Sequence, residues 1–241
     1  MSARKKYAMS NSRELCFRGL QKTSVIDFPG KVACVFFAGG CNFRCPFCHN
    51  TSLVNKSAPE VPWDTVWSFL RRRQNVLQGV VVSGGEPTLV PFLDDFLAKV
   101  RDMGLATKLD TNGYAPVVLE DLLNKNLLDF VAMDVKNSPR RYGESCGMDL
   151  VDLNSILRSV NLLKNSGIAY ELRTTVSNEL HTVEDIREMA EFLKGGKRYA
   201  LQPLNPGATL SGRAFTPPNE QTLKQMAAVM EEGFEQVLVR K

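Results

Sequence analysis

The chain has 241 residues, of which 44% are hydrophobic and 23% charged, values typical of one globular domain with a single core. Its formal net charge is +4, and the basic run at residues 71–73 falls inside a helical pattern, so nucleic-acid binding is not expected. The sequence has no run of about 18 apolar residues and no secretion signal at its start. We therefore expect a single cytoplasmic domain over residues 1–241, without a nucleic-acid or membrane partner.

The predicted elements follow one another regularly after an N-terminal segment, residues 1–30, that is expected to be irregular. The core, about residues 31–240, alternates apolar β-branched runs with amphipathic stretches. Strands are predicted at 31–37, 80–83, 106–111, 130–135, 169–176 and 198–203. Helices are predicted at 63–78, 91–103, 116–126 and 152–165, and a further one begins at Thr182, with Asp185 three residues later. The stretch 205–219 is rich in Pro and Gly and is expected to be a loop.

Six strands that alternate with helices predict an α/β fold, a parallel sheet with outer helices that is closed or partly closed into a (β/α)6 barrel. Sites in such folds form at the C-terminal ends of the strands. Polar segments occur at that end of each predicted strand, in the order CNFRCPFC, SGGEP, DTNG, DVK, RTT and QP. Their recurrence indicates one shared site.

Three cysteines lie in the first of these segments. Cys41, Cys45 and Cys48 have the spacing C-x3-C-x2-C, and a cubane iron-sulfur cluster with three thiolate ligands keeps one iron open for a substrate. The alternative is a zinc site completed by His49, but Cys48 and His49 are adjacent, whereas paired zinc ligands are normally separated by at least two residues.

The other three cysteines, Cys16, Cys34 and Cys146, are expected to be buried apolar side chains, because Cys34 lies inside a strand and the other two lack partners. Disulfides are not expected in a chain without a secretion signal.

The segment CNFRCPFC resembles the signature of the radical S-adenosylmethionine enzymes, and CHN directly after it is similar to the glycyl-radical-enzyme activases. Further similar segments follow in the same order, and they are GGEPTL, DTNG, MDVK and ELRTTV. The resemblance covers residues from about 20 to 240. It implies a partial barrel, one 4Fe-4S cluster held by Cys41, Cys45 and Cys48, and reductive cleavage of S-adenosylmethionine to a 5'-deoxyadenosyl radical that abstracts a hydrogen.

The resemblance also implies roles for residues at the strand ends. Gly84, Gly85 and Glu86 would bind the methionine ammonium group, although this segment could also be a plain turn. Phe47 corresponds to an aromatic residue beside the adenine, or it packs in the core. Asn112 belongs to the DTNG segment, which is expected at the cofactor.

Charged residues at the later strand ends have implied roles as well. Asp110, with Thr111, and Asp134 resemble a monovalent-cation site beside the cofactor carboxylate; a loop-capping aspartate is the alternative. Lys136 and Arg173 would donate to a carboxylate or to ribose hydroxyls, or they form structural ion pairs. Gln202 occupies the position where pyruvate formate-lyase activase has a histidine that contacts the cofactor.

The resemblance implies as partners a large glycyl-radical enzyme and a flavodoxin- or ferredoxin-type reductant. The absence of cysteine between Cys48 and Gly84 indicates a compact form, most similar to the activators of anaerobic ribonucleoside-triphosphate reductase. Three alternatives remain open: a pyruvate formate-lyase-type activase, an enzyme acting on a small molecule such as a 7-deazaguanine precursor, and a non-catalytic iron-sulfur or zinc module.

Overall fold

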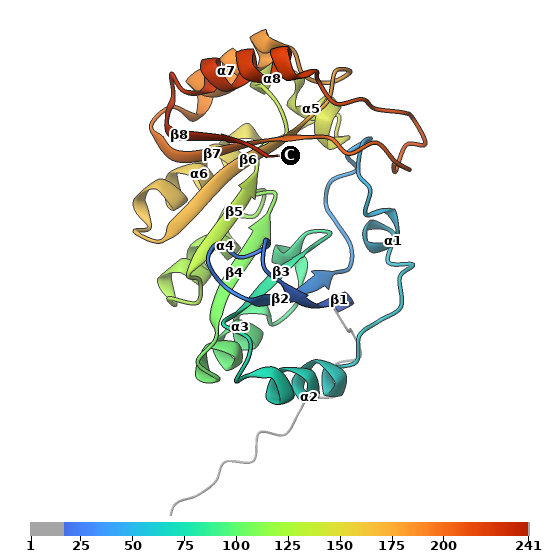
Figure 1. Cartoon of the computed structure of the whole chain (residues 1–241), viewed down its shortest axis with the longest axis vertical. Helices are drawn as coiled ribbons and strands as arrows, with labels where there is room; N and C mark the ends of the chain where they lie inside the picture. Colours follow the sequence, from blue (N-terminus) through green and yellow to red (C-terminus); the bar gives the residue numbers. More distant parts are fainter. Residues whose placement is uncertain (1–16, 241) are drawn as a thin grey trace, which may run out of the picture.

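The computed structural model describes residues 17–240, which form one eight-stranded sheet with helices on its outer face (Figure 1). The strands lie in chain order across the sheet, and only β1 is antiparallel to its neighbour. The strands are β1 (Phe17–Ser24), β2 (Ala33–Ala38), β3 (Gly79–Gly84), β4 (Ala106–Thr111), β5 (Phe130–Asp134), β6 (Ala169–Val176), β7 (Gly196–Pro203) and β8 (Phe234–Val239).

The helices lie mainly in the connections between parallel strands, as right-handed crossovers require. The α-helices are α1 (Thr51–Val54), α2 (Trp63–Arg73), α3 (Leu93–Asp102), α4 (Pro116–Asn124), α5 (Tyr142–Cys146), α6 (Leu153–Asn165), α7 (Val183–Leu193) and α8 (Glu220–Met230). Two 3-10 turns lie at Pro87–Leu89 and Pro139–Arg141. Within residues 17–240, no helix is long and apolar enough to cross a membrane.

The six predicted strands correspond to β2 through β7, and the predicted barrel class is confirmed. The expectation that residues 1–30 are irregular is wrong for 17–24, which form β1, while residues 1–16 lie outside the described residues. β1 buries only its two ends and is half or fully exposed between them, so it lacks the continuous apolar run that marks a central strand. β8 was missed for the same reason.

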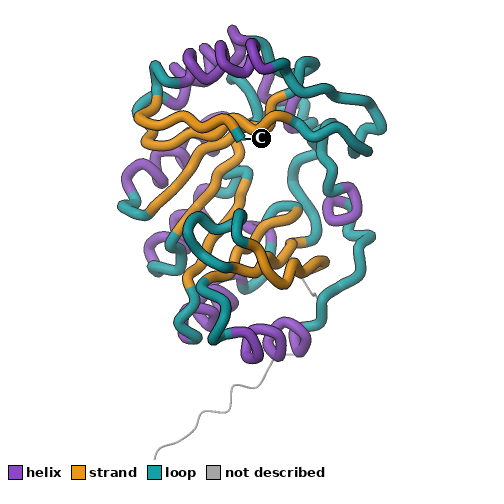
Figure 2. The backbone as a smooth tube through the Cα atoms, in the orientation of Figure 1, coloured by secondary structure: helices purple, strands orange, loops and turns teal. Residues whose placement is uncertain are grey.

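The sheet curves but does not close. In the described residues β1 pairs only with β2 and β8 only with β7, so the barrel has an open side (Figure 1). In Figure 2 the helices lie along the convex side of the sheet, and long loops gather on the opposite side. The concave side of the sheet, called the lumen below, is therefore reachable through the opening.

The main hydrophobic core lies between the sheet and its outer helices. A second, smaller apolar cluster fills the lower part of the lumen, and its members are Phe28, Ala33, Val35, Val81, Phe130 and Ala132. Phe28 comes from the β1–β2 loop, and its ring centre lies 6.3 Å from that of Phe130 on β5. The loop thus seals the lower lumen and leaves the strand ends above it for polar residues.

The capping signal at the start of α7 is confirmed. The Thr182 hydroxyl accepts from the Asp185 backbone N–H at 3.1 Å, and the Asp185 carboxylate accepts from the Thr182 backbone N–H at 2.9 Å. These bonds satisfy donors that the first helical turn leaves free.

Candidate active site

The cysteine loop, residues 39–50, follows β2 at the C-terminal edge of the sheet. Cys41, Cys45 and Cys48 all line a cavity of about 110 Å³, here called the cysteine cavity. Cys45 is 8% exposed, and Cys41 and Cys48 are half-buried. The three thiols predicted from spacing to act together therefore face one enclosed space.

Glycines at the end of β3 allow the cysteine loop to lie against the sheet. Gly84 has φ of +113°, and a Cβ on Gly85 would lie 2.0 Å from the Gly40 carbonyl oxygen. The close approach lets Gly85 N–H donate to the Ala38 carbonyl at 3.0 Å, while Glu86 N–H donates to Gly40 at 2.9 Å. Both glycines are therefore required by contact between two backbones.

A second segment, residues 204–219, holds the cysteine loop from the other side and is called the strap. Leu210 N–H donates to the Cys48 carbonyl at 2.8 Å, and Ser211 N–H donates to the Pro46 carbonyl at 3.2 Å. His49 Nδ1 lies 2.9 Å from the Ala208 carbonyl oxygen. The strap, irregular as predicted, fixes the part of the loop that contains Cys45 and Cys48.

The zinc alternative depends on the position of His49 relative to the thiols. Within residues 17–240 no three His, Cys, Asp or Glu side chains group closely enough to hold one metal ion. His49 is exposed, contacts the strap and does not line the cavity, so the zinc alternative lacks its fourth ligand. The Phe43 N–H lies 3.4 Å from Cys41 Sγ, a donor of the kind that supports cluster sulfurs.

Burial favours the protonated form of the Cys41 and Cys45 thiols by raising the pKa of each. It raises the pKa of Cys45 to about 12 and also raises that of Cys41, where the Phe43 N–H acts in the opposite direction. Because a thiol binds metal as the thiolate, assembly of a cluster here must release protons. The donor set and the enclosed cavity fit a cluster with three protein ligands.

Glu86 supports the cavity wall from within. Its side chain is 1% exposed, and Oε1 accepts from the Thr88 and Thr111 hydroxyls at 2.6 and 2.7 Å, while Oε2 accepts from Asn112 N–H at 2.8 Å. Burial raises the pKa of Glu86, and these hydrogen bonds oppose the rise. The carboxylate thus ties the SGGEP segment to the DTNG segment, because the protein itself satisfies both oxygens.

Arg173 bridges two carboxylates at the far wall of the cysteine cavity. Its Nε lies 2.5 Å from Asp134 Oδ1, and its Nη2 lies 3.4 Å from Asp110 Oδ2. Lys136 Nζ lies 3.3 Å from the second oxygen of Asp134, and Lys108 is ion-paired with the second oxygen of Asp110. Burial opposes ionisation of Asp134, but Arg173 and Lys136 outweigh it and hold the pKa of this carboxyl well below its usual range.

The same ion pairs bear on the predicted monovalent cation. Arg173 already lies between Asp110 and Asp134, and Thr111 donates its hydroxyl to Glu86. An added cation therefore does not fit between the two carboxylates unless Arg173 moves.

The remaining predicted residues, Asn112, Phe47 and Gln202, lie in three different places. Asn112 lines the cysteine cavity and donates to Asn42 Oδ1 at 2.7 Å, which ties the DTNG segment to the cysteine loop. Phe47 is 7% exposed, packs against Phe215 of the strap and lies outside the lining of the cavity. Phe43 lines it instead. Gln202 lies in a neighbouring cavity.

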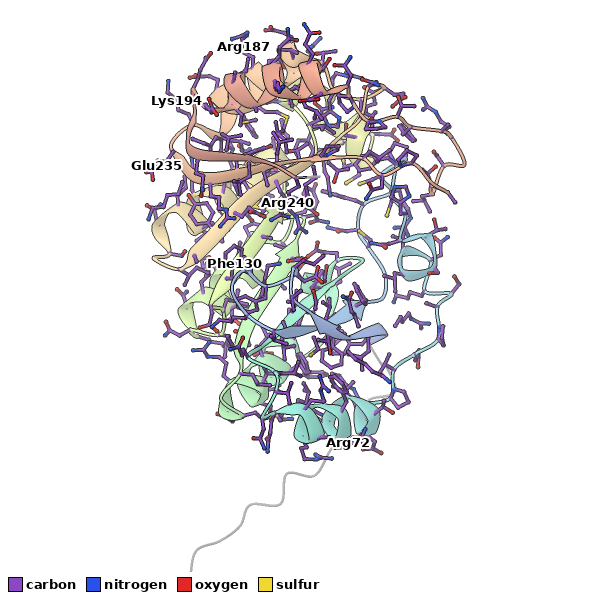
Figure 3. The ribbon with its side chains drawn as sticks, in the orientation of Figure 1. Arg72, Phe130, Arg187, Lys194, Glu235 and Arg240 are labelled. Atoms are coloured by element: carbon purple, nitrogen blue, oxygen red, sulfur yellow. The ribbon has the colours of Figure 1, made fainter. Side chains whose placement is uncertain are left out.

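That neighbour, here called the lumen cavity, has a volume of about 450 Å³ and shares Arg173 with the cysteine cavity. It is lined by Ile26, Asp27, Pro29, Lys108, Phe130, Glu171, Arg173, Gln202, Pro203, Asn205 and Arg240. Figure 3 labels Phe130 and Arg240, which lie near the middle of the molecule. Glu171 is 1% exposed and is paired with Arg240 at 2.5 Å and with Arg198 at 3.2 Å.

Several residues of the site were not predicted. Lys108 precedes Asp110 by two residues in β4 and therefore shares its face, so a lysine inside a buried strand was a usable signal. His181, which is 3% exposed, lies within 2.9 Å of the Lys136 carbonyl oxygen through Nε2, and its Nδ1 accepts from Ser177 N–H at 3.2 Å. No spacing pattern links His181 to the cavity.

The fold is an α/β barrel that is open on one side, and three cysteine thiols lie in a cavity at its strand ends. These features are typical of iron-sulfur enzymes with a partial barrel. Residues 35–194 match the family described as the Radical SAM superfamily. The chain is 31% identical over 231 residues to a Methanocaldococcus jannaschii protein named as a glycyl-radical enzyme activating enzyme, covering 92% of this chain and 94% of that protein.

A second relative is the pyruvate formate-lyase-activating enzyme of Clostridium pasteurianum, 30% identical over 200 residues, which are 79% of this chain and 81% of the relative. The chain therefore belongs to the radical SAM superfamily, among the glycyl-radical enzyme activating enzymes.

Solved structures agree on the fold. Streptococcus suis SuiB superposes with a TM-score of 0.67 at 15% identity, over 86% of this chain and 48% of SuiB, so the chain spans about half of that protein. A domain of a pyruvate-formate lyase-activating enzyme from Bacteroides vulgatus gives a TM-score of 0.54 at 18% identity, over 68% of this chain and 99% of that domain.

Proposed function

We propose that this enzyme generates a glycyl radical on a large partner enzyme, and that the partner is an anaerobic ribonucleoside-triphosphate reductase. One observation supports the proposal most strongly. The three cysteines, Arg173, Lys136 and the SGGEP segment all line one cavity. When bound, a three-thiolate 4Fe-4S cluster supplies an electron to S-adenosylmethionine, and the resulting 5'-deoxyadenosyl radical takes a hydrogen atom from glycine.

The residues of the cysteine cavity would bind and orient the methionine end of the cofactor. Gly84 and Gly85 present backbone groups at the cavity wall, and Lys136 and Arg173 offer cationic donors for a carboxylate. Glu86 acts one step away, because its oxygens are used to hold Thr111 and Asn112 in place. A monovalent cation would bind Asp110 and Asp134 only in competition with Arg173, which already pairs with both carboxylates.

The lumen cavity would receive the glycine loop. It lies on the other side of Arg173 from the cysteines, so a hydrogen donor placed there faces a cofactor bound in the cysteine cavity. Its mouth is formed by the β1–β2 loop and by Pro203 and Asn205, and Ile26 is 83% exposed there. The open side of the sheet leaves room for a polypeptide.

The partner choice rests on the compact chain and on Gln202, which lies in the lumen cavity and not in the cysteine cavity. The test mixes anaerobically reconstituted and reduced protein, S-adenosylmethionine and a candidate partner, and looks for the doublet of a glycine-centred radical by electron paramagnetic resonance. A doublet with the ribonucleotide reductase is expected. A doublet only with pyruvate formate-lyase would overturn the partner, and turnover of a small molecule without any doublet would overturn the activase function.

A further inference from the structure

The surface around the cysteine loop has an unusual charge distribution. Residues 39–59 and the strap, residues 204–219, contain no aspartate or glutamate, although the whole chain has 26 acidic residues. The same two segments contain Arg44, Lys56 and Arg213, and all three are exposed. Segments far apart in the sequence thus contribute positive charge and no negative charge to the same part of the molecule.

Contacts connect each of the three basic residues to the cysteine loop. Arg44 lies between Cys41 and Cys45, and its guanidinium donates to the Cys41 carbonyl at 2.6 Å. The Lys56 side chain lies beside Gly40, where it would be 2.8 Å from an added Cβ. The three basic residues are therefore placed around the cysteine loop by independent contacts.

Arg213 reaches the loop through two aromatic rings. Its guanidinium lies 5.4 Å from the ring centre of Phe215, whose ring centre lies 6.3 Å from that of Phe47, the residue between Cys45 and Cys48. Figure 1 shows the cysteine loop with α1 and the strap on the same side of the molecule, away from the outer helices α3, α4 and α6. Cys41 and Cys48 of the same loop are only half-buried, so part of each residue remains accessible from outside.

The positive charge on this surface is not neutralised by neighbours. Among the described residues none of the three has an ion pair, in contrast to Arg140 and Arg141 of the SPRRYGES segment, which pair with Asp185 and Glu144. The charges of Arg140 and Arg141 are thus already balanced within the protein. At the border of this surface Glu60 pairs with Arg18, and the Glu179 carboxylate accepts from the Thr216 hydroxyl of the strap at 2.8 Å.

We propose that Arg44, Lys56 and Arg213 form the docking surface for an acidic one-electron carrier protein, an inference that rests on the proposed function. Reductive cleavage of S-adenosylmethionine consumes one electron for each molecule that is cleaved. The carrier loses that electron, and a cluster held by the three thiols is reduced from the 2+ to the 1+ state. A carrier bound here approaches the thiols from outside, while the lumen cavity stays free for the glycine loop.

Charge complementarity of this kind acts mainly on the rate of association, which steering can raise by about 10- to 1,000-fold at low ionic strength. Screening removes the advantage as salt increases, because the Debye length is about 10 Å at 0.1 M and about 3 Å at 1 M.

The test uses cluster-loaded protein and an acidic flavodoxin. The variants are Lys56→Glu, Arg213→Glu and their combination, and the matched control is Arg72→Glu on α2, an exposed arginine at the opposite end of the molecule (Figure 3). Arg44 is left unchanged, because its guanidinium holds two carbonyls of the cysteine loop. The dissociation constant of oxidised flavodoxin is measured by titration, and the rate of cluster reduction by the reduced form is measured in stopped flow.

The double variant should weaken flavodoxin binding and slow reduction about tenfold or more at low salt, and the difference should shrink near 1 M salt. The control variant should match the parent. Equal effects of the double variant and the control would overturn the proposal. A second result would also overturn the proposal. If the double variant binds flavodoxin normally but forms no glycyl radical after photoreduction, the surface binds the protein substrate and not the electron carrier.

The failure of the proposed function gives a different result. If the photoreduced parent protein does not cleave S-adenosylmethionine, the proposed function is wrong. The flavodoxin dissociation constants test only the docking surface.

Discussion

The cysteine cavity and the lumen cavity meet at Arg173 but are built in opposite ways. The cysteine cavity is bounded by short contiguous segments that backbone hydrogen bonds hold together, such as Gly85 to Ala38 and Leu210 to Cys48. The lumen cavity is bounded by the β1–β2 loop, by side chains of β4 to β7 and by Arg240 near the C-terminal end of the described residues, and ion pairs such as Glu171 with Arg240 join distant parts of the chain. Backbone contacts tolerate few substitutions, whereas side-chain contacts can change one residue at a time. We therefore expect the residues around the cysteine cavity to tolerate fewer substitutions than those around the lumen cavity.

The largest effect is expected at the thiols. Cys45→Ala should abolish cluster binding and S-adenosylmethionine cleavage, because only two thiolates remain in the cavity. Cys34→Ala and Cys146→Ala are the controls, since both residues are fully buried and do not line the cavity. They should retain iron while losing about 1 kcal/mol or more of unfolding free energy. Iron analysis after anaerobic reconstitution checks this, and a control variant without iron would contradict the assignment.

Cofactor cleavage should be nearly as sensitive to substitution of Arg173, the residue that lines both cavities. Arg173→Lys keeps the charge but cannot contact Asp110 and Asp134 through two separate nitrogens of a planar group. Charged hydrogen bonds are worth about 1.5–3 kcal/mol, so kcat/KM for cofactor cleavage should fall about 10- to 100-fold. Wild-type kinetics in this variant would place the cofactor away from Arg173.

Glu86 tests whether the cysteine side depends on internal support. Glu86→Gln turns an acceptor into a donor beside the Asn112 N–H, so the free energy of unfolding should fall by about 1–3 kcal/mol. Asp94→Asn is the matched control, because Asp94 is an exposed partner of Lys125 and such pairs contribute about 1 kcal/mol or less. Urea unfolding of the cluster-free proteins measures both, and equal losses would show that Glu86 has no special role.

Acid should weaken the contacts that Asp185 makes at the start of α7. Asp185 accepts from Thr182 and pairs with Arg141; burial raises the pKa of its carboxyl, but these contacts outweigh burial and lower it. A lowered folded-state pKa adds stability that is complete above the unfolded value, about 3.9, and is lost as pH falls through the folded value. The stability difference between the parent and Asp185→Asn should thus be greatest above about pH 5 and shrink below it. A difference that grew in acid would reverse the sign.

The smallest effect on cofactor chemistry is expected in the lumen. Arg240→Ala removes one of the two ion pairs of the buried Glu171, while Arg198 keeps the other, so we expect a loss of about 1 kcal/mol and a fall in glycyl-radical formation of about fivefold. Cleavage of S-adenosylmethionine without the partner should not change. A parallel fall in both activities would mean that the two cavities are not separable in function.

The barrel class could be predicted because strand and helix alternation is a local pattern, and the family resemblance singled out residues that the structure places around the cysteine cavity. The strand and helix alternation from residue 31 onward matches β2 through β7, and Gly84 through Glu86, Asp110, Asn112, Asp134, Lys136 and Arg173 all line the cavity with the three cysteines. Parallel strands place their C-terminal ends at one edge, so segments that follow such strands meet whatever their distance in sequence.

The tertiary structure alone decided which partners these residues have. β1 and β8 are edge strands that form by pairing and carry no strong pattern of their own. Phe47 and Phe43 are both aromatic residues of the cysteine loop, but the strap covers Phe47 with Phe215 and leaves Phe43 to line the cavity. The ion pairs of Arg173 with Asp110 and Asp134, and the basic surface shared by Arg44, Lys56 and Arg213, depend on side chains that meet only after the sheet has curved, a geometry that no local spacing encodes.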